Sequence, residues 1–176
     1  ATQSWVKSFL VKPVEHEPST FFMYNTGATY MLGAIVHKVT GQLLEDYLKI
    51  RLFEPLGITD YDWEKSPEGL NTAGYGLRVS TEDIAKFGQL YLQKGKWNGK
   101  QLLPESWIEE ATKKQTTSQS GDNDWSQGYG YQFWRCKPGF YRGDGAFGQF
   151  CMMIPEQDAV LVMTCESFNL QKTMNV

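Results

Sequence analysis

The residue types most often used in catalysis and metal binding are sparse in this sequence. His16 and His37 are the only two histidines, and we expect one in a loop and the other on a helix. A zinc site or a Ser-His-Asp triad would need them brought together, and the sequence contains no G-x-S-x-G nucleophile elbow. We therefore expect His16 on the surface and His37 on a helix face.

Three further patterns could bind a ligand, but each lacks a defining residue. The segment Gly95–Lys100 has the wrong spacing for a phosphate-binding loop, and no serine or threonine follows it. The acidic cluster Asp122–Asp124 lacks the glycine and the terminal glutamate of a calcium loop. The cysteines form no C-x-x-C pair, so we expect them to pack in the core, with at least one thiol free. They are Cys136, Cys151 and Cys165.

The N-terminal two-thirds of the chain is expected to be helical. Apolar residues recur at helical spacing from Ala28 to Val39, and Gly41 stands where a C-terminal cap belongs. A second run, Leu43–Phe53, is expected to stop before Pro55. Other helices are expected at residues 5–10, 80–95 and 104–111.

After Gly128 the pattern changes to strands. Segments rich in aromatic and branched residues lie at 130–136, 146–154 and 159–165, separated by turn signals. Helices first and strands last, without alternation, indicate an α+β fold that ends in a three-stranded antiparallel sheet. We expect residues 27–114 to be mainly helical and residues 128–167 to supply the core strands.

Length and charge exclude several classes of function. The chain has 176 residues and a net charge of −3, without a run of like charge. This balance argues against binding to nucleic acid or to an anionic membrane, because neither has an electrostatic footprint here. No stretch approaches 18 apolar residues, so we expect no transmembrane helix.

Five blocks of sequence, in the same order, resemble the serine β-lactamase-like family, which includes class C β-lactamases, low-molecular-weight penicillin-binding proteins and related esterases. Together they cover nearly the whole chain. They are Phe22–Val36, Val39–Gly41, Leu52–Gly57, Ala73–Gly88, and Asp144–Gln149 with Pro155 and the valine-rich strand that follows.

The resemblance implies a serine hydrolase that acts through an acyl-enzyme and needs no metal or organic cofactor. Tyr24 falls on the tyrosine of the family's Tyr-x-Asn motif, which acts as a general acid or base once a neighbouring ammonium lowers its pKa. Thr26 falls on the Asn or Ser position, where its hydroxyl can bind substrate. Gly143-Asp144-Gly145 falls on the Lys-Thr-Gly motif, so Asp144 and Gly145 are expected to line the substrate along a strand edge.

The third motif departs from the family pattern. The lysine is absent, and Asp144 would repel the carboxylate of a β-lactam or of a peptide terminus, although Arg142 next to it could compensate. The departure shifts the expected substrate from penicillins and peptides to neutral esters or amides.

The nucleophile of the family lies in an S-x-x-K motif well upstream of the tyrosine. Ser4-Trp-Val-Lys7 matches that motif literally, but it is close to Tyr24, and a helix-surface serine is the simpler interpretation. We therefore expect residues 1–176 to be part of a larger domain whose upstream part carries the nucleophile, and the chain to be inactive alone. The alternative is a non-catalytic binding module. The resemblance suggests a periplasmic or extracellular location.

Overall fold

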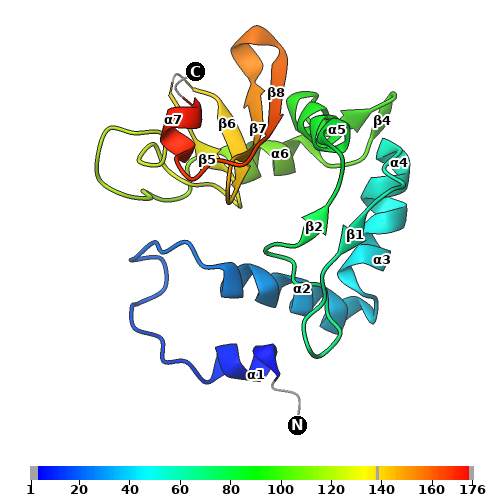
Figure 1. Ribbon diagram of the computed structural model, residues 1–176, viewed down its shortest axis with the longest axis vertical. Coiled ribbons are helices and arrows are strands. Elements are labelled where there is room, and N and C mark those ends of the chain that lie inside the picture. The colour runs from blue at the N-terminus through cyan, green and yellow to red at the C-terminus, as the bar shows by residue number, and fades with distance from the viewer. Residues whose placement is uncertain (1–3, 138, 175–176) are drawn as a thin grey trace. The chain divides into compact units, whose positions relative to one another are not determined.

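The computed structural model describes residues 4–137 and 139–174. These residues form helices and small antiparallel sheets (Figure 1). The chain divides into two units, Ala1–Ser80 and Thr81–Val176. None of the helices within the described ranges combines the length and the apolar character needed to cross a membrane.

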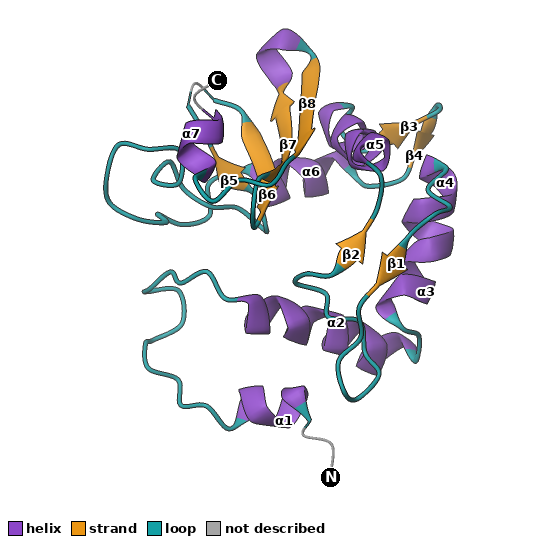
Figure 2. Ribbon diagram, in the orientation of Figure 1, coloured by secondary structure: helices purple, strands orange, loops and turns teal. Residues whose placement is uncertain are grey.

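The regular structure of the N-terminal unit is mainly helical, with long loops between the elements (Figure 2). Helix α2 ends at the predicted position, because Gly41 takes the left-handed conformation at φ 73° and its N–H donates to the His37 carbonyl at 2.8 Å. The short strands β1 and β2 pair antiparallel. In chain order, the elements are α1 (Trp5–Leu10), α2 (Thr26–Thr40), α3 (Leu44–Leu48), a π-helical turn (Lys49–Phe53), α4 (Glu54–Leu56), β1 (Asp62–Trp63) and β2 (Leu77–Arg78).

The helix that contains Pro55 does not stop where the sequence predicted. It continues through α4 to Leu56, so the expected end before Pro55 is wrong. Proline has no N–H, and in a regular α-helix its ring collides with the carbonyl four residues earlier. The π-helical turn widens the backbone just before the proline, with the Glu54 N–H bonded to the Lys49 carbonyl. The wider turn is what allows the helix to continue.

The C-terminal unit combines helices with a sheet in the order β5-β6-β7-β8, in which every neighbouring pair is antiparallel. A separate hairpin, β3 with β4, follows the first helix. The elements are α5 (Thr81–Leu92), β3 (Lys96–Trp97), β4 (Lys100–Gln101), α6 (Glu105–Thr112), β5 (Trp134–Arg135), β6 (Tyr141–Gly145), β7 (Gln149–Ile154), a 3-10 turn (Pro155–Gln157), β8 (Ala159–Thr164) and α7 (Leu170–Met174).

The sheet has four strands, so the prediction of three strands is wrong. The last two expected strands correspond to β7 and β8, and the expected strand at 130–136 is reduced to β5. The sequence pattern did not predict strand β6, because it contains two glycines and two charged residues. Glycine and aspartate have low strand propensity. Its pairing with β7, with Gly143 opposite Cys151, supplies the stability that local propensity does not.

Helix α5 packs on the sheet and closes the core of this unit. A side-chain Cβ at Gly88 would lie 2.6 Å from Val160 Cγ1 and 2.8 Å from Cys151 Sγ, so only glycine permits this close approach. The buried cluster consists of Tyr91, Ile108, Phe133, Tyr141, Cys151 and Met153. Cys136 is also buried and Cys165 is half-buried, and all three thiols are free. The expectation of core packing is thus confirmed for Cys136 and Cys151.

Candidate functional site

The tyrosine motif lies at the start of α2. Asn25 is the N-cap residue, and its side-chain oxygen accepts a hydrogen bond from the Ala28 N–H at 3.1 Å. Tyr24 therefore directly precedes the helix and Thr26 is its first residue. Tyr24 is 52% exposed and Thr26 is also exposed. The cap thus holds the phenol and the hydroxyl at one helix end, on the surface of the N-terminal unit.

The loop before β2 holds the start of α2 in place. A Cβ at Gly74 would lie 2.8 Å from Thr26 Cγ2 and 3.0 Å from the Thr26 carbonyl oxygen. Further along the helix, a Cβ at Gly33 would lie 2.7 Å from Ala73 Cβ. Two glycines, one on each side of the contact, therefore let the loop and the helix approach closely.

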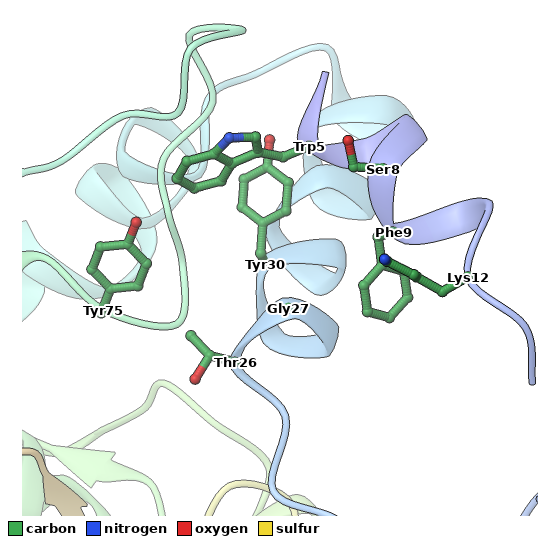
Figure 3. A pocket seen from close by; sticks show the side chains of 8 residues that line it. All are labelled: Trp5, Ser8, Phe9, Lys12, Thr26, Gly27, Tyr30 and Tyr75. Carbon is green, nitrogen blue, oxygen red and sulfur yellow. The ribbon is translucent and has the colours of Figure 1, made fainter. Parts of the chain in front are cut away.

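A cavity of about 340 Å³ adjoins Thr26 (Figure 3). Its walls come from α1 and the residues just after it, from the first turns of α2 and from the loop before β2, and half of the lining residues are aromatic. Trp5 meets the Tyr30 ring edge to face, with 5.5 Å between ring centroids. The lining residues are Trp5, Ser8, Phe9, Lys12, Thr26, Gly27, Tyr30 and Tyr75.

Tyr30 is unsuited to proton transfer at neutral pH. Its hydroxyl donates to Glu68 Oε1 at 2.5 Å and lies 3.0 Å from Ser66 Oγ. Burial, reinforced by the Glu68 carboxylate, raises the pKa of Tyr30 to about 12. Tyr30 therefore stays protonated at neutral pH, and its hydroxyl connects α2 to Glu68 and Ser66.

The literal S-x-x-K match has a structural role in α1. Ser4 is the N-cap of the helix, and its Oγ accepts a hydrogen bond from the Lys7 N–H at 3.2 Å. The Ser4 side chain also hydrogen-bonds Glu68. This geometry agrees with the interpretation of Ser4 as a helix-end serine.

The third motif lies on β6, where Asp144 pairs with Phe150 and Gly145 with Gln149 of β7. On its other side β6 pairs with β5 through Tyr141 and Arg142 only. Within the described residues, no strand therefore pairs with that edge of β6 at Gly143–Gly145. An open edge of this kind could accept an extended substrate through backbone hydrogen bonds.

The carboxylate of Asp144 points into its own unit. Its Oδ2 accepts hydrogen bonds from Trp125 Nε1 at 3.1 Å and from Arg142 Nε at 3.2 Å, and the Trp134 side chain also hydrogen-bonds it. Burial raises the pKa of Asp144 above its ordinary value, and Arg142 opposes that rise. Arg142 is itself fully buried. It therefore does not present its charge to a ligand, as it would need to do to compensate for the missing lysine.

Sequence reasoning missed the aromatic partners of both motifs. Trp125 lies 19 residues from Asp144, in a polar segment that predicted only a loop. The cavity residues Trp5 and Tyr30 belong to two helices, and the sequence pattern predicted the helices but not the contact between the two rings. The contacts become visible only when the elements are packed together.

The remaining candidates have ordinary surroundings. The His16 ring stacks on Phe21 with 4.2 Å between centroids, and His37 Nδ1 lies 3.0 Å from the Gln42 carbonyl oxygen. Asp122 forms an ion pair with Lys137. Across residues 4–137 and 139–174, no three His, Cys, Asp or Glu side chains cluster in a way that could hold a metal ion.

Comparison with known proteins gives relatives of both sequence and structure. The chain is 25% identical over 149 residues to the 6-aminohexanoate-dimer hydrolase of Paenarthrobacter ureafaciens, covering 80% of this chain and 38% of that protein. It is 38% identical over 55 residues to the lovastatin esterase of Penicillium rubens, covering 31% of this chain and 14% of that protein.

Among solved structures, a provisionally named 6-aminohexanoate-dimer hydrolase from Bacillus anthracis superposes with a TM-score of 0.71 at 26% identity, covering 84% of this chain and 39% of the other. The chain thus spans well under half the length of these relatives. The family model named Beta-lactamase matches residues 2–175. The chain belongs to the Beta-lactamase family.

Proposed function

We propose that the protein that contains this chain is a serine hydrolase that cleaves an ester or an amide through an acyl-enzyme. The observation that carries the proposal is the Tyr24-Asn25-Thr26 motif, capped and exposed at the start of α2 in a chain of the Beta-lactamase family. The named activities of two relatives, an esterase and a dimer hydrolase, agree with this reaction class.

In the proposed mechanism, a serine of an upstream S-x-x-K segment attacks the carbonyl carbon and forms an acyl-enzyme. Tyr24 exchanges the proton between the serine and the departing alcohol or amine, and water then hydrolyses the acyl-enzyme. The positive end of the α2 dipole favours the phenolate that this exchange requires. Because the nucleophile lies outside residues 1–176, this chain alone does not turn over substrate.

Substrate contacts are assigned to both motifs. Within the N-terminal unit, the exposed Thr26 hydroxyl is the candidate substrate contact. Within the C-terminal unit, the candidate contact is the backbone at Asp144 and Gly145, on the open edge of β6. The Asp144–Arg142 ion pair, 3.1 Å from Oδ2 to Nη2, is buried, so the Arg142 cation is not offered to a substrate carboxylate. A neutral ester or amide therefore suits this edge better than a penicillin or a peptide terminus.

The role of Tyr24 is tested in the longer protein that contains the upstream serine and lysine. Because positioned acid–base groups contribute about 10²–10⁴-fold, we expect Tyr24→Phe to lower kcat for an activated ester by at least about a hundredfold. Tyr131→Phe is the matched control, since Tyr131 is similarly exposed at 44% but belongs to neither motif. Full hydrolysis by Tyr24→Phe would refute the assignment.

The missing lysine of the third motif favours a second candidate, a binding module that has kept the fold and lost the chemistry. Intact-mass spectrometry after incubation with a penicillin and with an activated ester separates the two. We expect no adduct on this chain and a stoichiometric acyl adduct on the upstream serine of the longer protein. No adduct on the longer protein would support the binding module, and an adduct on Ser4 would show that the nucleophile has been misplaced.

A further inference from the structure

The side chain of Asp144 is saturated by contacts within its own unit. Only 11% of it is exposed, and Oδ2 alone meets Trp125 Nε1 at 3.1 Å, Arg142 Nε at 3.2 Å and Arg142 Nη2 at 3.1 Å. The Trp134 side chain adds another hydrogen bond. A carboxylate surrounded in this way contacts other protein groups in place of a ligand.

Arg142 completes the arrangement from the same strand. Its side chain is fully buried, its Nη1 contacts Cys136 Sγ, and its guanidinium carbon lies 4.5 Å from the centroid of the Trp125 ring. The indole is therefore held twice, through its N–H by Asp144 and through its ring face by the Arg142 cation. Both contacts come from residues two positions apart on β6.

Trp125 belongs to a loop whose ends are tied together. Thr116 and Tyr129 form an isolated antiparallel bridge, which closes the intervening segment, residues 117–128, into a loop. Inside it, the Trp125 N–H donates to Asn123 Oδ1 at 2.9 Å, and Ser118 Oγ donates to the Trp125 carbonyl. The backbone at Trp125 is thus fixed within the loop, while its side chain fixes the loop to β6.

We propose that Asp144 is a positioning residue that acts together with Arg142 to hold Trp125, and with it the loop 117–128, against the face of β6 from which both side chains project, next to the open edge at Gly143–Gly145. The consequence for substrate rests on the function proposed above. The backbone at Gly143–Gly145 would line the substrate, and the Trp125 loop would form a wall next to it. Asp144, which stands at the threonine position of the family's Lys-Thr-Gly motif, then shapes the site through Trp125.

The contact of Trp125 with Asp144 and Arg142 can be tested without any substrate. In Trp125→Phe the ring remains for Arg142 while the N–H bonded to Asp144 is lost. We expect amide hydrogen exchange in residues 117–128 to accelerate at least fivefold, while exchange in β7 and β8 stays unchanged. The matched control is Trp63→Phe, which removes an indole hydrogen bond of 3.0 Å, to the Tyr75 carbonyl, in the other unit. It should leave the loop unaffected.

A conservative variant guards against simple unfolding. Asp144→Ala would leave the buried Arg142 guanidinium without its carboxylate partner and could prevent folding altogether. Asp144→Asn keeps an acceptor oxygen for the indole and removes the charge that pairs with Arg142. We expect a folded protein in which the Trp125 Nε1–H resonance, assigned by its loss in Trp125→Phe, shifts and exchanges faster with solvent. An unchanged resonance and an unchanged loop would overturn the proposal.

Steady-state kinetics on the longer protein then tests whether the Trp125 loop borders the bound substrate. Because these residues position a surface and touch no reacting atom, Trp125→Phe and Asp144→Asn should raise KM several-fold and change kcat little. A released loop with an unchanged KM would overturn the assignment. If the unmodified protein shows no hydrolysis, the proposed function fails. The exchange and resonance measurements still show whether Asp144 and Arg142 hold the Trp125 loop.

Discussion

The close approach of Gly33 in α2 to Ala73 in the supporting loop predicts a strong coupling between these two residues. A Cβ placed on Gly33 would lie 2.7 Å from Ala73 Cβ, whereas its next neighbours, Leu44 Cδ2 and the Asn71 carbonyl oxygen, are 3.5 and 3.9 Å away. Both colliding carbons are bonded directly to the backbone, so neither can rotate away. Gly33→Ala must push the helix and the loop apart.

The expected magnitude follows from two opposing effects. Replacing a helix-interior glycine by alanine stabilises a helix by about 1 kcal/mol. Overpacking a close contact costs about 1–3 kcal/mol. We therefore expect Gly33→Ala to lower the free energy of unfolding by about 0–2 kcal/mol.

The compensating change is Ala73→Gly, which removes the other colliding carbon. Ala73 has a φ of 57°, so glycine relieves left-handed strain there. This gain offsets the added freedom of the unfolded chain, and the single variant should be nearly neutral. In that background Gly33→Ala meets only ordinary contacts and should stabilise by about 1 kcal/mol. The coupling energy between the two sites should therefore be about 1–3 kcal/mol.

Amide hydrogen exchange of α2 is the suitable assay, because a chain with two units need not unfold in one step. Urea unfolding followed by circular dichroism gives an independent value. The reasoning is refuted if the change in unfolding free energy of the double variant equals the sum of the two single changes to within about 0.5 kcal/mol, because independent sites are additive in this way. Stabilisation by Gly33→Ala in the unmodified background would refute it as well.

Two further predictions concern the helix cap and the thiols. Asn25→Ala removes the hydrogen bond to the Ala28 N–H and should destabilise α2 by about 1 kcal/mol, seen as faster exchange of first-turn amides. Asn25→Ser keeps a capping oxygen and should restore the slow exchange, and equal exchange in both variants would contradict the cap. Burial raises the pKa of Cys136 to about 11 and of Cys151 to about 12, so at pH 8 a thiol reagent should label only the half-buried Cys165 before unfolding. The folding stability linked to these two thiol protons is present below the ordinary thiol pKa and is lost as the pH rises toward 11–12. Fast labelling of Cys151 in the folded protein would contradict its burial.

Local pattern was sufficient wherever the interactions are local. The periodicity from Ala28 to Val39 and the glycine after it predicted α2, since both side-chain spacing and cap geometry depend on residues a few positions apart. The tyrosine motif, Tyr24 to Thr26, was assigned through the family resemblance, and its role stays a prediction. Strands β7 and β8 carry apolar side chains that mark them as strands in isolation.

Tertiary structure decided the features that depend on distant partners. Strand β6 exists because β7 pairs with it, although its own glycines and charges disfavour a strand. Asp144 was expected to face a substrate, but the structure directs its carboxylate to Trp125 and Arg142. Its surroundings depend on a residue 19 positions away, and local spacing carries no information about that distance. The sequence by itself therefore determined the family, most of the helices and the Tyr24 motif, whereas packing between distant segments decided the fourth strand and the direction of the Asp144 side chain.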